Sequence, residues 1–138
     1  MRLKIRSLLA AQSNPLTAIS CLAAGADQIF AEEALRCGAS LTAVVPANDY
    51  ENTMGDAVDN YETLQARATC IVQLEYEHAT KQAYMAAGRW VVDHCDVLVA
   101  VWDGQPAAGS GGTGDIVAYA DSIDRQIILV WPQNVVRN

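Results

Sequence analysis

The stretch "VLVAVWDGQPAAGSGGTGDIVAYA", residues 97–120, joins three different kinds of sequence. An apolar, β-branched run typical of a buried strand is followed by a loop with a glycine cluster and then by a helical pattern. This order places the first turn of a helix at the carboxyl end of a strand. In parallel α/β sheets, ligands bind at that end of the strands. The stretch therefore predicts an α/β fold with a ligand site in the loop.

The rest of the chain repeats the alternation of strand and helix. The patterns predict strands at 16–21, 41–46, 70–74, 97–102 and 126–132, and helices at 3–12, 28–38, 56–68, 77–95 and 114–122. Strands that are apolar on both faces and alternate with helices form a parallel sheet covered on both sides. We therefore expect residues 1–138 to form one α/β domain, a doubly wound, mostly parallel sheet flanked by helices (Rossmann-like).

Composition excludes several classes of function. The chain is 51% hydrophobic and carries a net charge of −7, with a pI near 4.6. This balance disfavours nucleic-acid binding, which uses a basic surface. No apolar stretch approaches the roughly 18 residues of a membrane span. Four cysteines without CxxC spacing are typical of reduced thiols in a cytoplasmic protein, and two distant histidines predict no metal site. We expect no cofactor and no membrane contact.

The glycine loop has the features of an anion site. Glycines let the backbone approach a ligand closely, and Thr113 is a candidate N-cap. The free N–H groups of the next turn would then face an anion together with the positive end of the helix dipole. No Lys or Arg lies between Trp90 and Ile123, so the backbone would supply the charge. The alternative is a merely flexible loop. Asp103 and Gly104 follow the strand and form either a polar contact at the cleft or a plain turn.

Two stretches resemble a known superfamily. "AISCLAAGADQIFAEEALRCGASLTAVVP" (18–46) is similar to the Smf/DprA segment in which a strand ends in a small-residue turn with Gly-x-Asp. "AGRWVVDHCDVLVAVWDGQPAAGSGGTGDIVAYA" (87–120) resembles the part shared by DprA and the LOG (lysine-decarboxylase-like) proteins, with its glycine-rich phosphate loop. Together they resemble the SLOG superfamily over most of residues 16–132.

This resemblance implies a Rossmann-like domain that binds a nucleotide or a nucleotide-derived ligand. Gly25 and Asp27 would line one side of the site, where Asp27 accepts hydrogen bonds from ribose hydroxyls or base amino groups. The alternative for Asp27 is a helix N-cap before Gln28. The ligand phosphate would contact four loop residues, namely Gly111, Gly112, Thr113 and Gly114.

Departures from the LOG pattern make binding without hydrolysis the leading expectation. LOG phosphoribohydrolases carry PGGxGTxxE, and Ile116 stands here in place of the glutamate. Asp115 lies one residue earlier, about 100° round the helix. If the chain is an enzyme, Asp115 and Arg89 are the candidate catalytic pair for N-glycosidic cleavage. A sensor or carrier is therefore expected, with a LOG-like phosphoribohydrolase and DprA-like single-stranded DNA binding as alternatives.

The beginning of the sequence departs from the family as well. Family members open with a strand whose following turn belongs to the ligand site, whereas this chain opens with the predicted helix at 3–12. We therefore expect the usual first strand to be missing here: either the true start lies upstream, or the sheet is completed otherwise, by another subunit. An open edge favours pairing with another chain, so a homodimer or higher homo-oligomer is expected.

Overall fold

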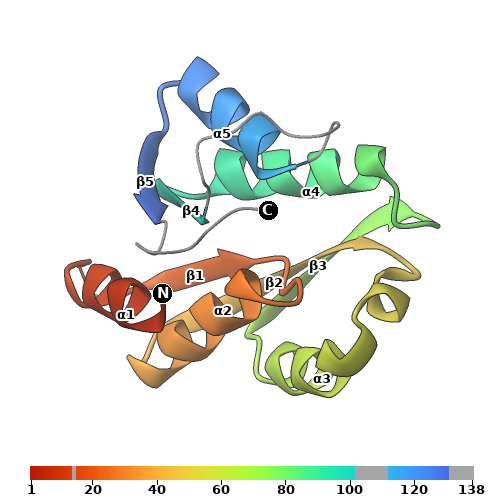
Figure 1. Cartoon of the computed structure of the whole chain (residues 1–138), viewed down its shortest axis with the longest axis horizontal. Helices are drawn as coiled ribbons and strands as arrows, with labels where there is room; N and C mark the ends of the chain where they lie inside the picture. Colours follow the sequence, from red (N-terminus) through yellow and green to blue (C-terminus); the bar gives the residue numbers. More distant parts are fainter. Residues whose placement is uncertain (14, 102–111, 131–138) are drawn as a thin grey trace, which may run out of the picture.

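The computed structural model describes residues 1–13, 15–101 and 112–130. Parallel strands alternate with helices throughout this part, which confirms the Rossmann-like α/β class (Figure 1). The strands are β1 (Thr17–Ser20), β2 (Ser40–Ala47), β3 (Cys70–Tyr76), β4 (Val97–Val101) and β5 (Gln126–Val130). The α-helices are α1 (Arg2–Ala10), α2 (Ala26–Arg36), α3 (Val58–Ala66), α4 (Lys81–His94) and α5 (Thr113–Ser122).

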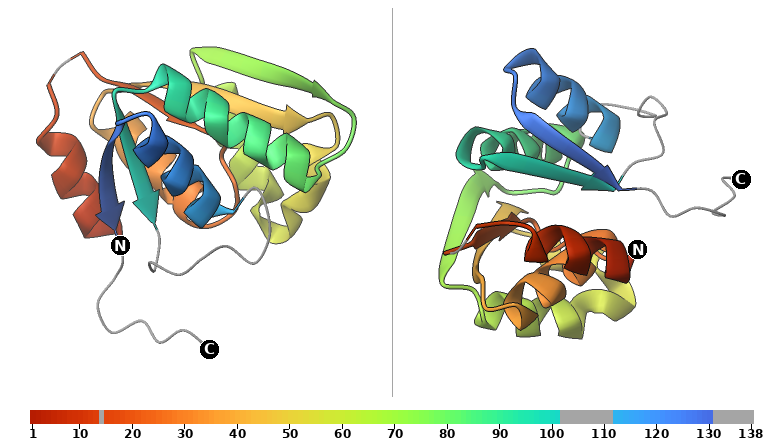
Figure 2. Two further views of the ribbon diagram at one scale, coloured as in Figure 1. Left: turned by 90° about the horizontal axis from the view of Figure 1, so that it is seen from above. Right: turned by 90° about the vertical axis from the view of Figure 1, so that its left-hand side faces the viewer.

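The described strands form two sheets, where the sequence predicted one. β1, β2 and β3 pair in that order, and β4 pairs with β5, in both cases with all strands parallel. Figure 2 shows the two sheets one above the other, with the chain passing between them from β3 to α4. The division lies between β1 and β4, because a cavity separates their edges.

The three-stranded sheet holds the larger core. α2 packs against β1 and β2, and α4 packs against β2 from the opposite side (Figure 1). β2 is therefore buried almost along its whole length, as its apolar sequence predicts. α1 is fixed to α2 by ion pairs, since Glu33 accepts hydrogen bonds from Arg2 at 3.0 Å and from Arg6 at 3.0 Å. These guanidinium groups lower the pKa of Glu33 to about 2.

The two-stranded sheet holds a smaller core. Val92, Leu98 and Ala120 are buried together between α4, β4 and α5. α4 and α5 approach closely at Gly88, where an added Cβ would lie 2.7 Å from Cγ1 of Ile116. A side chain at position 88 would therefore require the Ile116 side chain, or α5 with it, to shift.

Some element boundaries differ from the predicted ones. The helix predicted at 77–95 begins at Lys81, because β3 continues to Tyr76 and Thr80 caps the helix by accepting a 3.2 Å hydrogen bond from the N–H of Ala83. The helix predicted at 56–68 begins at Val58, after two 3₁₀ turns, η1 (Tyr50–Thr53) and η2 (Gly55–Ala57). Within the described ranges, no helix has the length and apolar character of a membrane span.

Candidate functional site

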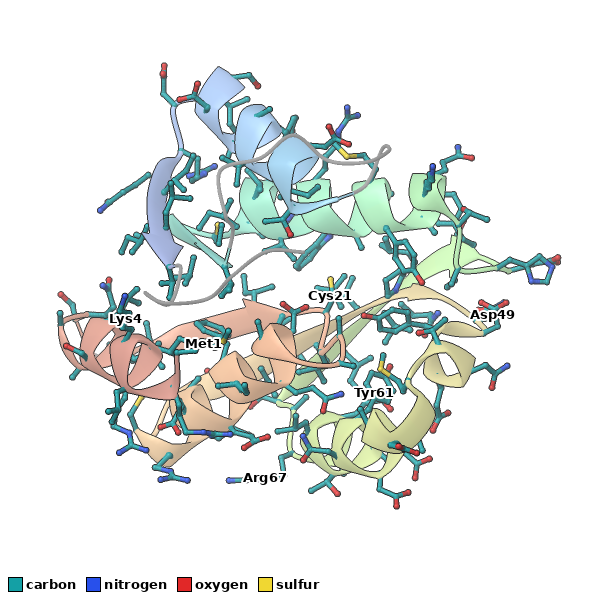
Figure 3. The ribbon with its side chains drawn as sticks, in the orientation of Figure 1. Met1, Lys4, Cys21, Asp49, Tyr61 and Arg67 are labelled. Atoms are coloured by element: carbon teal, nitrogen blue, oxygen red, sulfur yellow. The ribbon has the colours of Figure 1, made fainter. Side chains whose placement is uncertain are left out.

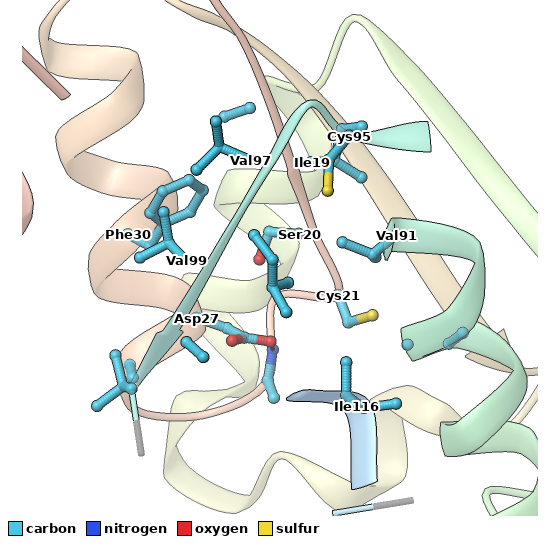
Figure 4. A pocket seen from close by; sticks show the side chains of 18 of the residues that line it. Ile19, Ser20, Cys21, Asp27, Phe30, Val91, Cys95, Val97, Val99 and Ile116 are labelled. Carbon is cyan, nitrogen blue, oxygen red and sulfur yellow. Dashed lines mark hydrogen bonds between the residues drawn. The ribbon is translucent and has the colours of Figure 1, made fainter. Parts of the chain in front are cut away.

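A cavity of about 1080 Å³ lies between the edges of β1 and β4. Its walls include residues of α1, α2, α4 and α5, and Figure 4 shows several of the side chains that line it. Figure 3 places Cys21, at the end of β1, between the two halves of the molecule. Pockets for small molecules range from about 300 to 1,000 Å³, so the cavity has room for a nucleotide.

Two helices begin at this cavity. Ala26 and Asp27 of the first turn of α2 line it, and so does Thr113, the first residue of α5. A helix N-terminus carries a partial positive charge and N–H groups without helical partners. The cavity therefore receives the positive ends of two helices, in the part of the fold where Rossmann-like proteins bind ligands.

The turn between β1 and α2 is held in an unusual backbone conformation. Leu22 has φ +57° and Gly25 has φ +93°. Leu22 is fully buried, its N–H donates to Oγ of Ser20 at 3.0 Å, and its carbonyl accepts from Nε2 of Gln28 at 3.1 Å. A non-glycine residue in the left-handed region persists only where its surroundings fix it, and such residues cluster at functional sites. The turn is therefore a rigid wall of the cavity.

Asp27 lines the cavity beside the turn that follows β1. Its carboxylate accepts a 3.3 Å hydrogen bond from the N–H of Ala23, which lies in the turn. Burial raises the pKa of Asp27, and the hydrogen bond from Ala23 opposes this only in part. Burial and the charge of Asp27 also raise the pKa values of Cys21 and Tyr50, which line the same cavity. A carboxyl group in such surroundings can bind ribose hydroxyls.

Asp27 is not the N-cap of α2, contrary to the alternative considered from the sequence. α2 begins at Ala26 with Gly25 as its N-cap, and Asp27 is the second helical residue. The positive φ of Gly25 lets the helix start at Ala26, two residues earlier than the predicted range 28–38. Gly25 itself is exposed in the turn and does not line the cavity.

The start of α5 also differs from its predicted form. Gly112 is the N-cap, and Thr113 is the first helical residue, so the prediction that Thr113 caps the helix is wrong. The N–H groups of Asp115 and Ile116 both donate to the carbonyl of Gly112, at 3.1 and 3.2 Å. Between described residues, the hydrogen bonds leave the N–H groups of Thr113 and Gly114 unused. Thr113 is exposed and lines the cavity.

The other predicted residues are placed as follows. Gly114 and Asp115 are half-buried in the first turn of α5, and neither lines the cavity. Asp103, Gly104 and Gly111 lie outside the described residues. Of the predicted residues, the structure thus brings Asp27 and Thr113 to one cavity. Gly112 directly precedes Thr113 in the chain.

Arg89 faces away from this cavity. It is exposed on α4, and its guanidinium carbon lies 5.1 Å from the ring centre of Tyr119 on α5. The hydroxyl of Tyr119 donates a 2.6 Å hydrogen bond to Asp93. Arg89 therefore belongs to an outer contact between α4 and α5, and neither it nor Asp115 lines the cavity.

Several cavity residues were not recognised as such from the sequence. Ile19, Phe30 and Val99 form much of its apolar lining, and Cys95 lies at the amino end of β4 (Figure 4). Each reads in the sequence as an ordinary core residue, because the pattern of a strand does not reveal that its edge is open. Among the described residues, no cluster of His, Cys, Asp and Glu side chains could hold a metal ion.

Comparison with known proteins finds no family model and no curated protein that matches this chain.

Proposed function

We propose that the chain binds a nucleotide or nucleotide-derived phosphate ligand at the end of the cavity where α2 and α5 begin, and that it acts as a sensor or carrier. The observation that carries the proposal is the joint presence of Asp27 and Thr113 on the wall of one cavity. They come from the first turns of two different helices, each at least ten residues long.

The phosphate is assigned to the α5 end of the site. The N–H groups of Thr113 and Gly114 have no partner among the described residues, and the N-cap Gly112 has no side chain to occupy the space. Backbone N–H groups and the helix dipole bind phosphate without help from lysine. This suits a chain whose described cavity walls contain no Lys or Arg.

The ribose or base is assigned to the α2 end. Asp27 would accept hydrogen bonds from two hydroxyls or from an amino group, and the aromatic ring of Phe30 lies one helical turn further on the same wall. The fixed turn at Leu22 keeps this wall in place before a ligand arrives. A preformed wall lowers the entropy cost of binding.

Binding without hydrolysis is the form of the proposal that the placements favour. Glycosidic cleavage of the LOG type needs an acid or base within hydrogen-bond reach of the substrate, and the pair expected for it, Asp115 and Arg89, lies off the cavity wall. The resemblance to SLOG proteins is compatible with either outcome and supports the ligand class alone.

Calorimetric titration with AMP, ribose 5-phosphate and inorganic phosphate tests the proposal. We expect saturable binding of at least one, accompanied by thermal stabilisation. If none of these compounds binds or shifts Tm, nucleotide binding is rejected. Release of free base from ribonucleoside monophosphates would instead support a phosphoribohydrolase, and salt-sensitive binding of oligonucleotides would support a DNA binder.

A further inference from the structure

The cavity is bounded by two open strand edges. In the described part of the chain, β1 pairs with β2 and β4 pairs with β5, each through one edge. Residues 17–21 and Val97–Val101 line the cavity without interruption. Because consecutive residues of a strand point to opposite faces, a cavity that touches all of them lies beside the edge of the strand. The second edges of β1 and β4 therefore face the same space.

The two edges are arranged to accept one further strand. Figure 4 shows β1, which carries Ile19 and Ser20, and β4, which carries Val97 and Val99, running in the same sense. A strand placed between them would be parallel to both, like the strand pairs among the described residues. Its N–H and C=O groups would pair with the open edges on both sides, and the two sheets would become one.

We propose that this slot binds an extended apolar segment of a partner polypeptide, which adds as a parallel strand between β1 and β4. The inference does not rest on the proposed nucleotide site, but the segment and the nucleotide would share one cavity and would both contact Asp27 and Phe30. Addition of a strand to an open sheet edge is an established mode of peptide recognition. Here two edges would hold one segment.

The walls define the chemistry of the segment. Apolar side chains lie on both sides of the slot: Phe30 of α2 on one side, and Val91 of α4 and Ile116 of α5 on the other (Figure 4). Side chains on both faces of the added strand would be buried, so both must be apolar. Val97 and Val99 are half-buried at present and would lose further contact with water.

Charge defines the ends of the segment. The carboxylates that line the cavity are those of Asp27, beyond the carboxyl end of β1, and Asp96, just before the amino end of β4. The described walls have no Lys or Arg to balance them. Basic residues on both sides of the apolar segment would complement these two charges. Because β4 has five residues, the apolar part should be about as long, roughly 17 Å.

A folded second copy does not meet these requirements. The segment must have both of its own edges free, whereas the outer strands β3 and β5 each have one edge paired within their own sheets. β3 also carries Gln73 and Glu75, which would be buried without partners. A folded second copy therefore fits the slot less well than a single extended segment of a partner polypeptide.

A synthetic peptide in excess over the full chain tests the proposal. The probe is the peptide KKVIVIVKK with blocked ends, and the control is KKVPVPVKK, whose prolines lack the N–H donors of a strand. We expect the probe to raise Tm by about 5–10 °C near saturation and the control to leave Tm unchanged. Equal stabilisation by both peptides, or by neither, overturns the proposal.

Thiol alkylation locates the bound peptide. Cys21 and Cys95 line the cavity, and Cys37 and Cys70 are exposed elsewhere. At a probe concentration about ten times Kd, alkylation of Cys95 should slow about tenfold, and that of Cys37 and Cys70 should not change. Protection of Cys95 that appears without peptide as the protein concentration rises would assign the slot to a second copy and overturn the proposal.

Two matched variants complete the test. Val99→Lys places a charge in the slot, and Ile71→Lys places one on β3, where the residue is 49% exposed. The Val99→Lys protein should lose the Tm shift, and the Ile71→Lys protein should keep it. A folded Val99→Lys protein that retains the whole shift contradicts the proposal; if this variant does not fold, the two peptides and the alkylation rates of the unaltered chain decide.

Discussion

The N–H of Ala23 donates a 3.3 Å hydrogen bond to the carboxylate of Asp27, which ties the turn after β1 to the first turn of α2. This single bond only partly offsets the burial that raises the pKa of Asp27. A half-buried carboxylate with so little support reduces stability in its charged form. Its presence at the cavity is explained if a ligand supplies the missing hydrogen bonds.

Asp27→Asn should therefore stabilise the free protein at neutral pH, by about 2–4 °C in Tm. Because the pKa of Asp27 is raised on folding, the charge of Asp27 lowers the stability of the wild-type protein only at pH values above 3.8, its ordinary pKa. The advantage of the variant should be small below that pH and grow as the pH rises through the folded pKa. Thermal melts across the pH range measure it, with the exposed Asp121→Asn as control.

The same substitution should weaken binding of AMP and leave binding of inorganic phosphate unchanged, since only AMP has ribose hydroxyls for Asp27. Calorimetry on both compounds gives the comparison. Equal losses for the two compounds would remove Asp27 from the ribose site.

The ion pairs that join Glu33 to α1 should make the stability of the protein sensitive to acid. Hydrogen bonds from Arg6 and Arg2 lower its pKa from 4.5 to about 2. A group whose pKa falls on folding stabilises the protein above the unfolded value, and this contribution is lost as the pH drops through the folded value. The wild-type protein should lose stability between about pH 4.5 and pH 2, and Glu33→Gln should flatten that part of the curve. The exposed Glu75→Gln should follow the wild type.

Much of the fold could be predicted from the sequence. The apolar runs that became β2 and β4 and the glycine that ends α2, Gly38 with φ +89°, each indicate their structure locally. The division of the sheet could not be predicted in the same way, because apolar strands read alike whether one or both edges are paired. The positive φ of Leu22 was equally hidden, since leucine rarely adopts it.

The candidate site was predicted less completely than the fold. Thr113 was singled out by its place between the glycine loop and a helix, and Asp27 by the resemblance to SLOG proteins; both line the cavity. Arg89 was singled out by its place in the helix before β4, but the side chain turns outward to Tyr119. Sequence order indicates which end of a helix lies near a site and gives no direction for a side chain in its middle.

Gly88 provides a test of the packing that positions α5. In Gly88→Ala, the new Cβ would collide with the side chain of Ile116. We expect a loss of about 1–3 kcal/mol in the free energy of unfolding, typical of overpacking, and weaker phosphate binding because α5 shifts. Urea denaturation measures the loss. In the background of Ile116→Ala, the same change should cost much less; an undiminished cost would place the clash elsewhere.

A negative charge introduced at the start of α5 tests whether this helix end binds an anion, because the charge should weaken anion binding without destabilising the helix. Thr113→Glu favours the helix dipole by a few tenths of a kcal/mol and repels an anion. The variant should keep or slightly raise Tm and bind AMP at least about fivefold more weakly. Ser122→Glu, at the other end of α5, is the control and should leave AMP affinity unchanged. Unaltered affinity in Thr113→Glu would exclude this helix end from the site.

The central claim is that the amides at the start of α5 hold the phosphate of the ligand. The most direct measurement is a two-dimensional ¹⁵N–¹H NMR titration of the labelled chain with AMP. We predict saturable shifts of the Thr113 and Gly114 amides, with the same Kd as shifts at Ala23 and Asp27 across the cavity. If these amides stay in place while the nucleotide is present in large excess, or if the shifts gather on another face of the molecule, the account is contradicted.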